Sequence, residues 1–78
     1  MITLKEACKI GEKECGAPIV KIIETNTCWI FKDAKRVNHG QIVISPMVEK
    51  ATGELVKDFS DPDKLYDGWK EIPVPTDY

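Results

Sequence analysis

The side chains with the most reactive chemistry in this chain are three cysteines and one histidine, namely Cys8, Cys15, Cys28 and His39. Such a set could hold zinc or supply a thiolate–imidazole pair. A helical pattern places Cys8 and Cys15 on one helix, which separates their Cα atoms by roughly 10 Å at 1.5 Å of rise per residue. Two thiolates on one zinc ion lie only about 4 Å apart, so these two cannot share a metal. We expect no metal and no cofactor, and interpret the cysteines as small buried hydrophobic residues.

A Cys–His nucleophilic pair is not supported by the surroundings of the histidine. His39 precedes Gly40 in a charged segment with Lys35 and Arg36, where a solvated side chain is expected. The sequence shows no glycine-rich oxyanion motif and no residue placed to orient the imidazole. We therefore expect a surface histidine and a protein that is not an enzyme.

Four aspartates gather around the start of a short helix predicted near the C-terminus: Asp58, Asp61, Asp63 and Asp67. They do not form a calcium loop, because Leu65 stands at a ligand position and Pro62 interrupts the spacing. Carboxylates are favoured at a helix N-terminus by the helix dipole, which is a purely structural explanation. Aromatic residues beside acids also resemble an interface centre with a charged rim. On that interpretation the candidate partner-binding residues are Asp61, Asp63, Tyr66, Asp67 and Trp69.

Length and charge limit the function further. A chain of 78 residues has room for one domain, residues 1–78, with a modest core that can hardly spare volume for an interior cleft. The net charge of −2 is uneven, since residues 1–39 carry seven Lys and Arg against five Asp and Glu, and residues 40–78 carry four against eight. The acidic half disfavours nucleic acid as a partner. No apolar run approaches membrane-spanning length, and three cysteines without a signal-like segment predict a reduced, cytoplasmic protein.

The first element is a helix predicted over 4–15. Thr3 and Glu6 match a capping box, in which each side chain satisfies a backbone donor. Gly16 can end the helix in a left-handed cap, and Pro18 prevents its continuation. Gly11 lies on the buried stripe, which indicates a close approach to a sheet beneath it.

Four strands are expected after this helix, at 18–25, 28–31, 41–48 and 54–59. The last two form a hairpin whose tight turn needs positive φ at Gly53. Pro46 lacks an amide donor, so its strand is an edge, bulged or bent there. A short helix through Leu65 and Trp69 follows, with Ser60 and Asp61 as candidate caps, and the tail at 72–75 is extended by prolines. The expected fold class is α+β: an N-terminal helix packed on a four-stranded antiparallel sheet, then a short C-terminal helix and an extended tail.

Both faces of this sheet carry apolar residues. In the first strand, regular alternation points Val20 and Ile22 one way and Ile19 and Ile23 the other. One helix covers only one face, so the other requires the C-terminal segment, a second copy of the chain or a partner. We expect Trp29 in the core, whereas Trp69 is as compatible with packing on the sheet as with partner contact.

The order of elements resembles the YrhB-type immunity-protein family, small bacterial domains of polymorphic toxin systems. The features that carry the resemblance are the opening helix, the apolar strand at 18–23, the aromatic strand at 29–31 and the hairpin that ends Thr52-Gly53-Glu54. The chain departs from the family in its short connection at 33–40 and in its proline-rich tail. The resemblance implies a non-enzymatic inhibitor that binds a toxin domain, and an acidic half would suit a basic toxin. The alternatives are a small structural or regulatory domain, including a homodimer closed through an uncovered sheet face, and a small-ligand-binding domain.

Overall fold

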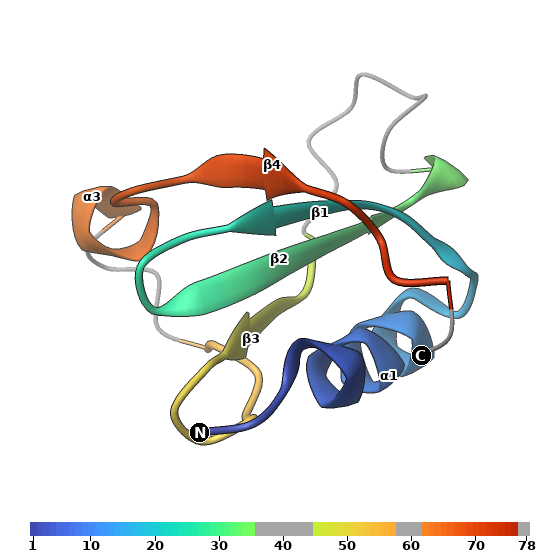
Figure 1. Cartoon of the computed structure of the whole chain (residues 1–78), viewed down its shortest axis with the longest axis horizontal. Coiled ribbons are helices and arrows are strands. Elements are labelled where there is room, and N and C mark those ends of the chain that lie inside the picture. The colour runs from blue at the N-terminus through green and yellow to red at the C-terminus, as the bar shows by residue number, and fades with distance from the viewer. Residues whose placement is uncertain (36–44, 58–61, 77–78) are drawn as a thin grey trace.

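An N-terminal helix lies across one face of a four-stranded antiparallel sheet (Figure 1). The computed structural model describes residues 1–35, 45–57 and 62–76. The strands stand in the order β3-β2-β1-β4, and every neighbouring pair is antiparallel. The expected α+β class, with its helix on a four-stranded antiparallel sheet, is thereby confirmed. The elements are α1 (Leu4–Cys15), β1 (Ile19–Glu24), β2 (Cys28–Asp33), β3 (Met47–Glu49), α3 (Pro62–Leu65) and β4 (Lys70–Ile72).

The bounds of α1 are those expected from its capping residues. The Thr3 hydroxyl accepts a hydrogen bond from the Glu6 N–H at 3.2 Å and donates one to the Glu6 carboxylate, also at 3.2 Å. At the other end Gly16 is left-handed, with φ of 71°, and its N–H donates to the carbonyl of Glu12 at 2.8 Å. Local chemistry therefore fixes both ends of this helix.

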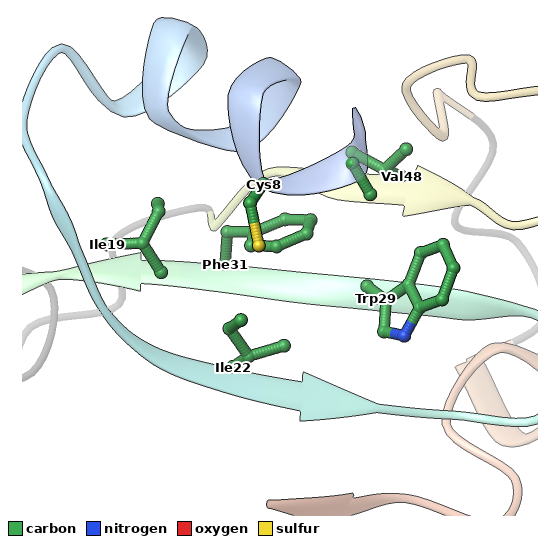
Figure 2. Close-up of a cluster of buried hydrophobic side chains, with 7 residues drawn as sticks. Cys8, Ile19, Ile22, Trp29, Phe31 and Val48 are labelled. Atoms are coloured by element: carbon green, nitrogen blue, oxygen red, sulfur yellow. The ribbon is translucent and has the colours of Figure 1, made fainter. Parts of the chain in front are cut away.

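The main core lies between α1 and the sheet (Figure 2). Phe31 is fully buried at its centre, directly beneath Gly11. A Cβ atom on Gly11 would stand 2.5 Å from Cγ of Phe31, so the expected close approach of helix and sheet is confirmed. The buried members of this helix-side cluster are Ala7, Cys8, Ile19, Ile22, Trp29, Phe31 and Val48.

A bulge in β1 overturns the alternation expected for that strand. Ile19 pairs with Asp33 and Lys21 with Lys32, so Val20 is an extra residue without a partner on β2. The extra residue turns the strand, and Ile19 and Ile22 consequently share the helix-side cluster rather than opposite faces. Val20 is left 50% exposed.

The hairpin forms around Gly53, with φ of 76°, as expected. Its two arms are joined by the Glu49 N–H, which donates to Glu54 at 2.9 Å, and by a single bridge between Val48 and Leu55. The expectation of a full fourth strand at 54–59 is wrong over its described part, because 54–57 makes one isolated bridge with β3 and the two backbone hydrogen bonds that flank it. Of the strand expected at 41–48, the described part is regular from Met47 only, since Pro46 has no N–H to donate to the ladder.

The fourth strand of the sheet is instead β4, which lies between the expected short helix and the expected tail and takes in only Ile72 of that tail. The short helix α3 ends at Leu65, earlier than the expected end at Trp69. Lys70–Ile72 pairs antiparallel with β1, with Ile72 opposite Ile22 and Lys70 opposite Glu24. Beyond β4 the chain turns toward α1 (Figure 1), and Ile72 and Val74 pack against the helix-side cluster.

The opposite face of the sheet has its own smaller cluster. Cys28, Ile30 and Met47 are buried there, and the partly buried side chains that pack on them are Ile23, Val56 and Leu65. The C-terminal segment was one of three possible covers for this face, and of its described residues Leu65 packs there whereas Ile72 and Val74 lie on the helix side. Trp29 is buried in the core, as expected, and Trp69 is exposed.

Candidate docking surface

Two large aromatic side chains stand out of the surface on the turn between α3 and β4. Tyr66 is 46% exposed and Trp69 is 65% exposed. The four residues Tyr66–Trp69 are here called the aromatic turn. A Trp of this exposure makes little contribution to the core, and interface centres are enriched in Trp and Tyr.

The aromatic turn is tied to the loop between β1 and β2. The N–H of Asn26 donates to the backbone carbonyl of Asp67 at 2.9 Å, and the Asn26 amide donates to the Asp67 carboxylate at 3.1 Å. Gly68 has φ of 71°, and a Cβ on it would collide with the side chain of Asn26. The loop and the turn therefore fit closely, which holds the two aromatic residues in place.

The acidic residues proposed for docking have different surroundings. Asp63 is exposed in the first turn of α3, and Asp67 is exposed and bonded to Asn26. Asp61, like Asp58, lies outside the described residues, and so does His39. The structure shows that Asp63, Tyr66, Asp67 and Trp69, which are close in sequence, are all exposed, and it adds a bracing role for Asp67.

A charged cluster around Glu24 was not foreseen from the sequence. The Glu24 carboxylate accepts a hydrogen bond from Nε1 of Trp29 at 3.1 Å and pairs with Lys50 at 3.0 Å and Lys70 at 3.5 Å. Nζ of Lys50 also lies 5.3 Å from the centre of the Trp29 ring, within cation–π range. The hydrogen bond with Lys50 is the largest cause that lowers the pKa of Glu24, against an opposing effect of burial.

One sequence signal could have found part of this cluster. The turn at 26–27 has two residues, so it makes Thr25 and Cys28 partners and places Glu24 opposite Trp29. The lysines come from distant segments, which no local pattern relates to Glu24. The cluster ties β1, β2, the hairpin turn and β4 together, and we interpret it as structural.

The cysteines are divided between the two faces of the sheet. Cys8 is buried in the helix-side cluster and Cys28 in the smaller one, while Cys15 is half-buried at the end of α1. Burial, aided by Glu12, raises the pKa of the Cys8 thiol to about 11, which makes it a poor nucleophile. Within 1–35, 45–57 and 62–76, no three His, Cys, Asp or Glu side chains are grouped to bind a metal ion.

An open depression of about 460 Å³ adjoins the end of α1. Its lining is mostly charged or small: Lys9, Glu12, Lys13, Gly16, Ala17 and Pro18. Small-molecule sites bury most of the ligand against apolar walls, which this lining does not provide.

Neither described helix has the length and hydrophobicity to cross a membrane. Comparison of the chain with protein-family models, with curated proteins and with solved structures gave no match.

Proposed function

We propose that this protein is a non-enzymatic protein-binding module that docks its partner on the aromatic turn. The observation that carries the proposal is the exposure of Trp69 and Tyr66 on a turn held by Asn26. A flexible loop would lose conformational entropy on binding, whereas a braced turn has already lost much of it. Large rigid aromatics in such a setting are the residues that most often dominate binding energy.

The charge of the C-terminal half supports a basic partner. Residues 40–78 carry eight Asp and Glu against four Lys and Arg, and Asp63 lies exposed three residues before Tyr66. Complementary charge speeds association and discourages wrong partners. In its finer form the proposal is that the partner is a basic toxin domain and that the chain acts as its immunity protein, as the sequence resemblance implies.

The first test is affinity capture from the native host with wild-type protein and the Trp69→Ala variant in parallel. The exposed Val20 offers a matched control, Val20→Ala, because it removes a comparable exposed apolar side chain from β1. A partner retained by wild type and Val20→Ala should dissociate faster from Trp69→Ala, with affinity lower by about thirtyfold for a hot-spot residue. Equal affinity for all three proteins would place the docking surface elsewhere.

The second test addresses charge. The double variant Asp61→Asn, Asp63→Asn keeps Asp67 and hence the brace to Asn26. With a captured partner we expect slower association and a weaker dependence on salt, with dissociation little changed. An association rate equal to wild type in low salt would show that these carboxylates serve only the helix. For the toxin form, co-expression with a candidate toxin should restore growth with wild type and fail with Trp69→Ala.

A further inference from the structure

Among the described residues, β4 is the edge strand of the sheet whose outer side pairs with no other segment. At the opposite edge of the sheet, β3 is covered by the second arm of the hairpin, residues 54–57. Val48 forms a bridge with Leu55, and the Val56 N–H donates to the carbonyl of Met47 at 2.8 Å. β4 is last in the strand order, and it follows the aromatic turn directly.

The register shows which backbone groups of β4 face outward. The N–H of Thr25 points toward β2 and donates to the carbonyl of Cys28. The N–H of Asn26 points the other way, toward the β4 side, and donates to the carbonyl of Asp67. Because the direction alternates along a strand, Glu24 and Ile22 also face β4, opposite Lys70 and Ile72. The N–H and C=O of Glu71 therefore point away from β1, as does the carbonyl of Trp69.

We propose that an extended segment of the partner adds to β4 as a fifth, antiparallel strand, paired through the backbone of Glu71. This inference rests on the proposed function and specifies its binding mode. Pro73 occupies the next outward position and has no N–H, so the pairing ends there and the added strand is short. The main affinity then comes from Trp69 at one end of the pairing.

Side chains of β4 define the chemistry of the added strand. Glu71 is 66% exposed and shares one face with Trp69, while Lys70, 68% exposed, shares the other with Ile72. Charge complementarity then requires Arg or Lys opposite Glu71, Asp or Glu opposite Lys70, and an apolar or aromatic residue opposite Trp69. Glu71 meets Lys21 at 3.6 Å, but exposed pairs of this kind are weak and can exchange for a partner's cation.

A second copy of this chain fits the edge poorly. A symmetric antiparallel pair centred on Glu71 would oppose two glutamates, and one centred on Lys70 would oppose two lysines. Centring on Ile72 would place Glu71 opposite Pro73, where one of the two hydrogen bonds has no donor. Like charges directly opposite one another are destabilising, so the occupant is a different protein.

The test uses a synthetic peptide of about six residues, the usual length of a strand, that carries the required order of apolar, acidic and basic side chains. Titration into isotope-labelled protein should shift the amide signal of Glu71 and slow its hydrogen exchange in the wild type. Glu71→Pro removes the outward donor, and Glu71→Ala is the matched control that removes only the side chain. We expect Glu71→Pro to weaken peptide binding roughly tenfold and Glu71→Ala to weaken it less.

A control peptide with its acidic and basic residues exchanged should bind more weakly than the designed one. Shifts confined to Tyr66 and Trp69, unaffected by Glu71→Pro, would overturn strand addition and leave the aromatic turn as the docking surface. The absence of any shift at Glu71 would likewise overturn strand addition. Capture of the partner by Trp69→Ala tests the docking surface, and the peptide titration tests strand addition. The failure of one proposal can therefore be told from the failure of the other.

Discussion

At Gly11 the chain has no room for a side chain, although the position is inside a helix. Alanine there would improve helix propensity by about 1 kcal/mol in an open setting. Its Cβ would lie within 3 Å of three atoms of the Phe31 side chain, and overpacking of this kind typically costs about 1–3 kcal/mol. We expect Gly11→Ala to lower the free energy of unfolding by roughly 1 kcal/mol in urea titration. The exposed Glu14→Ala is the matched control, and a gain in stability at both positions would contradict the close packing.

Gly53 is constrained twice, by its φ of 76° and by Ile2, whose Cγ2 would lie 2.9 Å from an added Cβ. A β-branched residue is strained at positive φ. Gly53→Val should therefore destabilise the fold by about 1 kcal/mol or more in thermal unfolding. Gly53→Asn tolerates the backbone better and should cost less, because only the contact with Ile2 then remains. Unchanged stability in Gly53→Val would show that the left-handed conformation is not required.

The three thiols should differ sharply in reactivity in the native protein. Burial holds the pKa of Cys8 at about 11, and Cys28 is buried on the other face, whereas Cys15 is half-buried. We expect alkylation at pH 8 to label Cys15 first, as read by peptide mass spectrometry. All three should titrate as free thiols in denaturant, and fewer than three, or an equivalent of zinc by elemental analysis, would contradict this.

Among the elements, the sequence predicts best those whose signals are local. The bounds of α1 follow from Thr3, Glu6 and Gly16, which act on their own neighbours in the chain. The strand Lys70–Ile72 was missed because three residues before a proline carry no strand pattern, and their partner β1 is distant in sequence. Hydrophobic alternation also failed at Val20, since a bulge adds a residue that periodicity cannot reveal.

The difference between local signals and contacts distant in sequence also applies to the candidate docking surface. Residue type alone indicates Tyr66, Trp69 and the acids, because aromatic residues are enriched at interface centres and polar residues lie at their rims. Exposure of Trp69 could not be predicted, since it depends on which segments fill the core. The bond from Asn26 to Asp67 joins residues far apart in the chain, so the second role of Asp67 was equally hidden.

The brace of the aromatic turn can be tested at Asn26. Asn26→Ala removes its side-chain hydrogen bond to Asp67, and we expect a loss of roughly 0.5–1.5 kcal/mol in unfolding free energy. Hydrogen exchange at Trp69 should become faster. Asn26→Asp should be worse at neutral pH, because two carboxylates would then face each other. Unaltered exchange at Trp69 in both variants would show that the turn is held by other contacts.

For the molecule as a whole, the Glu24 cluster links stability to pH. The folded-state pKa of Glu24 is lowered from its ordinary value near 4.5, chiefly by its hydrogen bond with Lys50. A lowered pKa means that the charged form favours the fold, so this stabilisation is complete above the unfolded value and is lost as pH falls through the folded one. We expect the wild type to lose stability below about pH 4.5 and Glu24→Gln to lose less of it.

At neutral pH, Glu24→Gln should cost roughly 1.5–3 kcal/mol, the usual contribution of hydrogen bonds to a charged group. Lys50→Met removes the main partner and is the second arm of a double-mutant cycle. If the pair acts as a unit, the double variant will be less destabilised than the sum of the single variants. An additive result would show that the cluster is incidental to stability. So would a loss of stability at low pH that is the same in Glu24→Gln as in the wild type.

The bulge at Val20 has an evolutionary consequence. A one-residue insertion or deletion in the regular part of β1 would turn every later side chain to the opposite face of the sheet and exchange its buried and exposed sides. At Val20 the strand already has one residue that pairs with nothing on β2. Ile19, which precedes this extra residue, still packs in the core. Loss of that residue would restore a regular strand with Ile19 still opposite Asp33. This is therefore the position in the sheet where relatives of the protein can differ in length while keeping the same core.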